Sequence, residues 1–180
     1  MNDIAEELYK LHKLSGAAFI DQLKAVTVRP EFHPLADEPA IFTVGGERNE
    51  DYSNLMIAAQ KAVAHGYRVY ILPNPSGKRT ADFILERKGV YKMFDLKSIS
   101  GKSSAINRLM ESIGQTNHVM LNMLTDYDPR QLAKDIQSYF ETNKEAREVL
   151  VMKGNKFLSV SRQFVEGNSY VKMFMKRYLR

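Results

Sequence analysis

The chain has 180 residues, of which 44% are hydrophobic and 26% charged, with a formal net charge of +5 and no cysteine. This composition excludes a disordered chain, a disulfide framework and a cysteine-based zinc site. No apolar run reaches the eighteen or so residues of a membrane span, so we expect a folded protein kept in the cytoplasm, with no membrane association.

The first forty residues are expected to form a helical arm followed by a connector. Apolar residues recur at helical spacing and stop before Gly16, which predicts one helix over residues 2–14. Three prolines between Pro30 and Pro39 exclude a helix or a central strand there. We therefore predict an arm over residues 1–40 and a domain over residues 41–180, with its core at residues 51–125.

The predicted core alternates between helical and strand patterns. An amphipathic stripe that ends at Gly66 predicts a helix, three β-rich runs follow, and Lys88-Gly89 is a short turn between the last two runs. A second helical stripe and a compact apolar run complete the core. In chain order the predicted elements are a helix over 51–65, strands over 67–72, 82–86 and 90–97, a helix over 104–115 and a strand over 118–124.

The last third of the chain is expected to add one helix and two strands. Pro129 suits the first turn of a helix that continues to Ala146, and two strands follow around Gly154-Asn155. The excess positive charge is partly concentrated at the C-terminus, which suits a polyanionic partner or is simply a solvated basic tail. These basic residues are Lys172, Lys176, Arg177 and Arg180.

Charged residues on the predicted third strand indicate a catalytic site. Side chains alternate along a strand, so Asp95 and Lys97 share one face. A hairpin with the preceding strand would bring Asp82 beside Asp95. Two carboxylates can hold Mg²⁺ or Mn²⁺, which stabilises charge on a scissile phosphate, and the ammonium can orient water or neutralise the phosphate. Glu50 or Glu47 is a further candidate metal ligand.

This pattern resembles the PD-(D/E)xK nuclease superfamily. Asp82 followed after twelve residues by Asp95-Leu96-Lys97, in a helix-strand-strand-strand-helix-strand order, is similar to its D...(D/E)xK signature, with Ala81 in place of the usual proline. The segment over residues 65–123 also resembles the C-terminal toxin nuclease domains, including tRNases, of contact-dependent inhibition proteins and related phage or mobile-element proteins. The resemblance covers about residues 51–125 and leaves both ends of the chain unexplained.

The resemblance implies an α/β (α+β) fold with a central mixed sheet flanked by helices, like that of restriction endonucleases. It implies a metal-dependent, toxin-like nuclease acting on RNA (tRNA) or DNA, with Asp82, Asp95 and Lys97 catalytic, and a cognate immunity protein as a possible partner. The oligomeric state is left open. Positions that match substrate-binding residues of such families are Ser98, Lys102, Ser103, Asn107, Arg108 and Gln115.

Two other functions remain open on the sequence alone. A metal-independent RNase of the barnase or colicin type needs only a base, an acid and a cation, for which Lys97, Ser98, Lys102 and His118 are candidates. A non-catalytic nucleic-acid-binding or scaffold protein of a mobile element is the third possibility, although the presence of all three charged residues gives no sign of a decayed site.

Overall fold

The computed structural model describes residues 4–44, 52–73, 81–101 and 103–180. The chain divides into two compact units, Met1–Asp95 and Leu96–Arg180, and the boundary falls within strand β5 (Val90–Ile99). Each unit is described by itself. The expected division at residue 40 into an arm and a domain stays a prediction.

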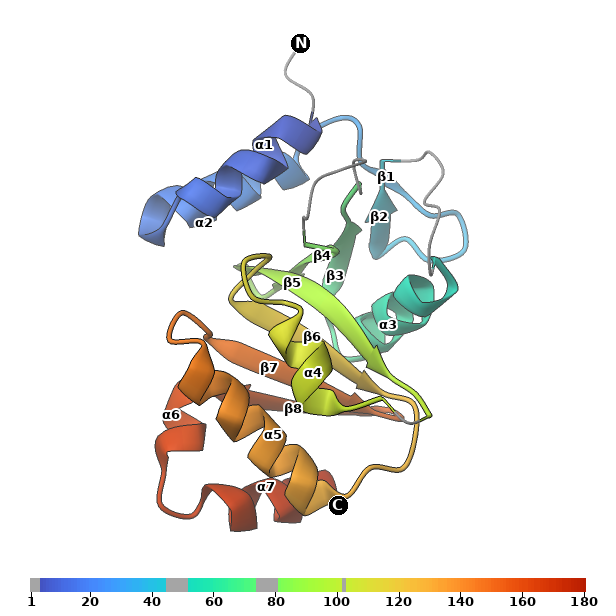
Figure 1. Cartoon of the computed structure of the whole chain (residues 1–180). Helices are drawn as coiled ribbons and strands as arrows, with labels where there is room; N and C mark the ends of the chain where they lie inside the picture. Colours follow the sequence, from blue (N-terminus) through green and yellow to red (C-terminus); the bar gives the residue numbers. More distant parts are fainter. Residues whose placement is uncertain (1–3, 45–51, 74–80, 102) are drawn as a thin grey trace. The chain divides into compact units, whose positions relative to one another are not determined.

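The first unit contains a sheet with strand order β1-β2-β3-β4-β5. Strands β2 and β3 are parallel, and the other neighbouring pairs are antiparallel. The elements of this unit before β5 are α1 (Ile4–Lys10), the 3₁₀ helix η1 (Leu11–Lys13), α2 (Gly16–Thr27), β1 (His33–Pro34), β2 (Ile41–Thr43), α3 (Tyr52–Ala64), β3 (Arg68–Ile71) and β4 (Phe83–Arg87) (Figure 1).

The N-terminal helices pack on one face of this sheet. Tyr70, Ile84 and Met93 lie next to one another across β3, β4 and β5 and belong to one buried cluster. The helices add five buried residues to that cluster, namely Ile4, Leu8, Leu11, Leu23 and Val26. The predicted helix before Gly16 is present in the described residues from Ile4 to Lys13, as α1 followed directly by η1. A second helix that the sequence analysis did not predict, α2, begins at Gly16, whose φ of 59° lies in the left-handed region.

Helix α3 confirms the amphipathic stripe that precedes the strands. It packs against β2 and β3 and buries Leu55, Ala58, Ala59 and Ala62. Three of these four residues are alanines, so the helix backbone can approach the sheet closely. Gly66, at a φ of 87°, follows the helix as its C-terminal stop, as the sequence predicts.

The second unit contains the end of β5 and the strands β6 to β8, in the order β5-β6-β7-β8 (Figure 1). Strands β6 and β7 are parallel, while β7 and β8 form an antiparallel hairpin. The elements of this unit after β5 are α4 (Ala105–Met110), β6 (His118–Met123), α5 (Pro129–Thr142), β7 (Glu148–Lys153), β8 (Lys156–Ser161), α6 (Arg162–Glu166) and α7 (Tyr170–Tyr178).

Helices α4 to α7 share one buried cluster with strands β5 to β8. Leu121 of β6 and Val151 of β7 are paired in register and both belong to it. Helix α5 begins at Pro129, where the Asp128 carboxylate accepts a hydrogen bond from the backbone N–H of Gln131 at 2.7 Å. Cap and apolar stripe together fix this helix against the sheet.

The expected fold class is confirmed. The chain has a mixed sheet with helices, and the order helix-strand-strand-strand-helix-strand is present as α3-β3-β4-β5-α4-β6. Helix α4 is shorter than predicted, because the chain turns after Met110 and passes Gly114 at a φ of 88°. Helices α2, α6 and α7 and strands β1 and β2 are additions to the predicted elements. In the described ranges, no helix combines the length and apolarity needed to span a membrane.

Candidate active site

A tight hairpin fixes the register of the two strands that carry the candidate acids. Lys88 and Gly89, between β4 and β5, have φ values of 52° and 79°, as in the two-residue turns whose twist matches that of paired strands. The Glu86 carboxylate accepts a hydrogen bond from the N–H of Gly89 at 2.9 Å. The predicted hairpin is confirmed, and it pairs Phe83 with Phe94.

Asp82 is held by its backbone between two strands. Its N–H donates to the carbonyl oxygen of Phe94 at 3.0 Å, and its carbonyl oxygen accepts from the N–H of Leu72 at 2.9 Å. Because Phe94 directly precedes Asp95, the two acids lie side by side on neighbouring segments of the first unit. The prediction that their carboxylates share one cation stays a prediction.

The two acids lie next to the face of the sheet that the N-terminal helices cover. Asp95 lies two residues after Met93, and Asp82 lies two residues before Ile84, and both apolar residues belong to the cluster built with those helices. Asp95 is 3% exposed and Asp82 is partly buried. A carboxylate with so little access to water requires compensation by a cation or by hydrogen bonds.

Lys97 lies two residues after Asp95 on the same strand, so strand alternation places both side chains on the same side of β5. Lys97 is only 9% exposed. A buried ammonium close in sequence to a buried carboxylate lowers the free-energy cost of burying either charge. The catalytic roles of Asp95 and Lys97 stay a prediction.

Of the remaining predicted site residues, Ser98 directly follows Lys97 on β5, and the others lie elsewhere in the chain. Glu50, Glu47 and Lys102 lie outside the described residues. Arg108 is partly buried and forms an ion pair with Glu111 at 2.6 Å, and its assignment as a substrate-binding residue stays a prediction. The other four substrate-binding candidates belong to the second unit, where Asn107 is exposed and Ser98, Ser103 and Gln115 are partly buried.

The candidate ligands have the type of donor atom that hard divalent cations prefer. Asp82 and Asp95 offer carboxylate oxygens, which Mg²⁺ and Mn²⁺ prefer. Among the residues that the structure describes, no three histidine or acidic side chains gather as a metal-binding group. The assignment of Asp82, Asp95 and Glu50 as metal ligands stays a prediction.

His118 belongs to a polar cluster in the second unit. Its Nδ1 lies 3.2 Å from Oε1 of Glu148, the residue that pairs with it across β6 and β7. The buried Glu148 carboxylate also accepts a hydrogen bond from the hydroxyl of Ser159. The sequence singled out His118 but not these partners, because the parallel pairing joins positions thirty residues apart.

Comparisons with known proteins add little to this description. No protein family matches the chain, and no curated protein matches it. One solved structure, described as "CdiA-CT/CdiI toxin and immunity complex from Burkholderia pseudomallei", matches with a TM-score of 0.43 and 17% sequence identity, over 65% of this chain and 92% of that chain. We draw no functional conclusion from a similarity of this degree.

Proposed function

We propose that the chain is a nuclease that hydrolyses phosphodiester bonds of nucleic acid with the help of a divalent cation. Asp82 and Asp95 would hold Mg²⁺ or Mn²⁺, with Glu50 as a third carboxylate ligand, and Lys97 would neutralise charge that develops on the scissile phosphate. The observation that carries the proposal is the hydrogen bond from Asp82 N–H to the Phe94 carbonyl, because it aligns the two acids on adjacent segments.

Two further observations support this function. Asp95 and Lys97 are both buried on a strand whose other buried residues are apolar, and charged groups are costly to bury unless they are paired or bind a ligand. The element order around them is that of the nuclease superfamily that the sequence resembles. The same resemblance is the basis for proposing a toxin-like role, with a cognate immunity protein as partner.

The metal's contribution is to polarise the phosphate and to activate the attacking water. The chain's own residues bind the cation and orient the phosphate. The carboxylates would hold the cation, and the Lys97 ammonium would donate hydrogen bonds to the non-bridging oxygens and offset their negative charge. The residues proposed to contact the nucleic-acid backbone are Ser98, Lys102, Ser103, Asn107, Arg108 and Gln115.

A metal-independent RNase is the second candidate, favoured by the pair of His118 and Glu148. A carboxylate on one ring nitrogen orients a histidine that exchanges protons through the other. In that reaction the substrate's 2′-hydroxyl attacks its own phosphate, which leaves a 2′,3′-cyclic phosphate.

The test is incubation of the purified chain with DNA and with total RNA, in Mg²⁺, in Mn²⁺ and in excess EDTA. The proposal predicts cleavage that needs the cation. Cleavage that survives EDTA and leaves cyclic phosphate ends selects the second candidate. Binding without cleavage under every condition selects a non-catalytic nucleic-acid-binding protein.

A further inference from the structure

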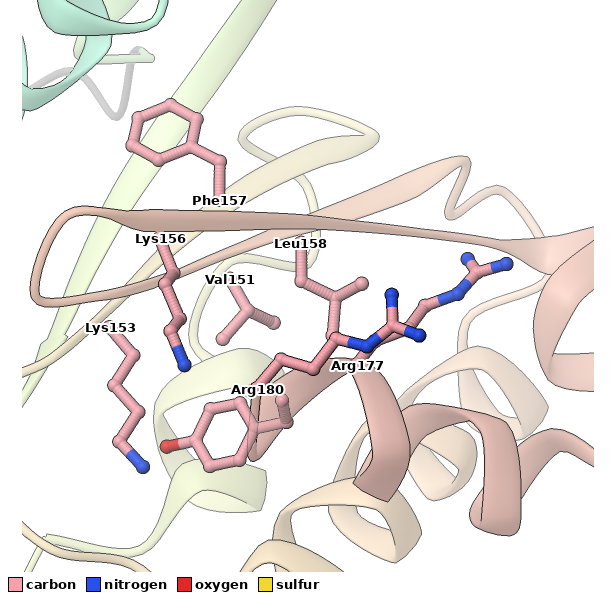
Figure 2. A pocket seen from close by; sticks show the side chains of 8 residues that line it. Val151, Lys153, Lys156, Phe157, Leu158, Arg177 and Arg180 are labelled. Carbon is pink, nitrogen blue, oxygen red and sulfur yellow. The ribbon is translucent and has the colours of Figure 1, made fainter.

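The second unit contains a pocket of about 260 Å³ between the β7–β8 hairpin and the end of helix α7 (Figure 2). Its lining combines basic side chains with an apolar floor, and Figure 2 shows Lys156 and Leu158 on one side of strand β8 while Phe157 points to the other. The lining residues are Val151, Lys153, Lys156, Phe157, Leu158, Arg177, Tyr178 and Arg180.

Four cations surround this pocket. Lys153 and Lys156 are paired across the hairpin turn. Arg177 lies in the last turn of α7, and Arg180 follows that helix. Like charges that line one pocket repel one another, and an anion between them would relieve the repulsion.

Carboxylates are sparse in the segment that supplies these side chains. From Leu150 to Arg180 the sequence has seven basic residues and one acidic residue, Glu166. Glu166 lies 3.8 Å from Arg162, away from the pocket lining. Within the described part of the chain, the pocket cations contact aromatic rings instead: Lys153 lies 4.4 Å from the ring centre of Tyr178, and Arg177 lies 4.9 Å from that of Phe164.

The hydroxyl of Tyr178 is a second, independent observation at this pocket. The residue is 3% exposed, and its hydroxyl has no hydrogen-bond partner among the described residues. Burial, together with the negative charge of Asp126, raises the pKa of Tyr178 above its ordinary value of 10.0. A buried hydroxyl left unpaired costs free energy, which an acceptor oxygen of a ligand would recover.

We propose that this pocket binds a backbone phosphate of a nucleic-acid strand. The guanidinium groups of Arg177 and Arg180 have the fork geometry that suits phosphate oxygens, and the ammonium groups add charge. Val151 and Leu158 form a floor against which a sugar can pack. Lys172 and Lys176 are exposed on the same helix and extend the basic surface beyond the pocket, which suits a polymer with successive phosphates.

This binding site does not depend on the proposed cleavage, so binding is measured without it. The probe is a fluorescein-labelled 12-nucleotide 2′-O-methyl RNA in EDTA, followed by fluorescence anisotropy with the full chain at several salt concentrations. The pocket variant is Lys156→Gln/Arg177→Gln. Its matched control is Lys134→Gln/Lys144→Gln, which removes the same charge from exposed positions of the second unit outside the pocket.

Removing two phosphate contacts should weaken binding by about tenfold and reduce the slope of log K against log salt by roughly 1.4, since each contact with a single strand contributes about 0.7. The control should change affinity less than about twofold and keep the slope, because its lysines contact no phosphate. Tyr178→Phe, which keeps every charge, should also weaken binding, with thermal melting showing that each variant is folded.

Equal losses in the pocket and control variants would overturn the proposal, because net charge alone would then explain binding. Wild-type affinity in Tyr178→Phe would overturn the role of the hydroxyl and with it the assigned pocket. Binding of poly-L-glutamate as tight as that of the oligonucleotide would also contradict it and would indicate a surface for an acidic protein.

Discussion

Two buried charges on one strand are the most informative residues of this chain. Asp95 and Lys97 lie on the same side of β5, and the backbone N–H of Asp82 donates a hydrogen bond to the carbonyl oxygen of Phe94, the residue before Asp95. Alternation along a strand and a glycine turn were enough to predict this arrangement. The sequence could not predict the partners of His118 or the buried hydroxyl of Tyr178, because both arise from pairing and packing between distant segments.

Replacing Lys97 should abolish most cleavage while leaving nucleic-acid binding largely intact. The ammonium acts on charge that develops in the transition state, so Lys97→Ala should lower kcat by about 10² to 10³. The matched control is Lys92→Ala, which changes the same residue type at a position of opposite parity on β5. Wild-type kcat in Lys97→Ala at an unchanged melting temperature would end the assignment of this strand as the active site.

An ion pair in the N-terminal region should contribute less to stability at acidic pH, because its carboxylate becomes protonated there. Arg29 donates hydrogen bonds to the Glu31 carboxylate at 3.0 and 3.1 Å and also pairs with Glu7 of α1. The hydrogen bond from Arg29 lowers the pKa of Glu31 below its ordinary value of 4.5. The resulting contribution to stability is complete above that ordinary value and is lost as the pH falls through the lowered one.

In Arg29→Leu, the Glu31 carboxyl should therefore titrate at a higher pH than in the wild type, as followed by ¹³C NMR of the side-chain carboxyl. The same titration midpoint in both proteins would show that the pair does not form in solution.

At the scale of elements, the clearest predictions came from the pattern between residues 51 and 124. Helix α3, the hairpin and β6 follow from stripes and turns of the local sequence. Helix α7 was absent from the predicted elements, although Tyr170, Phe174 and Tyr178 recur every four residues. The abundance of lysine and arginine in this segment favoured a solvated tail and obscured the stripe.

Helix α7 should be an integral part of the second unit's core. Phe174 is fully buried in the cluster built by β6, β7 and α5, so Phe174→Ala should cost about 3 to 5 kcal/mol of unfolding free energy. Its neighbour Met173 is 37% exposed, and Met173→Ala should cost less than about 1 kcal/mol. Urea unfolding measures both values, and equal small losses would contradict the packing of α7.

At the scale of the whole molecule, the sequence predicted the fold class but not all of the helices and strands. The central helix-strand order is encoded locally, whereas α2, β2 and the two C-terminal helices complete the units through long-range packing. The two functional proposals concern different parts of the chain: catalysis on β5, with Asp82 and Asp95 in the first unit, and phosphate binding in the second unit.

The central claim is that Asp82 and Asp95 bind the cation on which cleavage depends. The direct measurement is the Mg²⁺ dependence of the cleavage rate for wild type and for Asp82→Asn/Asp95→Asn, with thermal melting as the control for folding. The account predicts saturable activation of the wild type by Mg²⁺ and a loss of at least about 10² in rate for the folded double variant. A folded double variant that cleaves at the wild-type rate with the same Mg²⁺ dependence would contradict it.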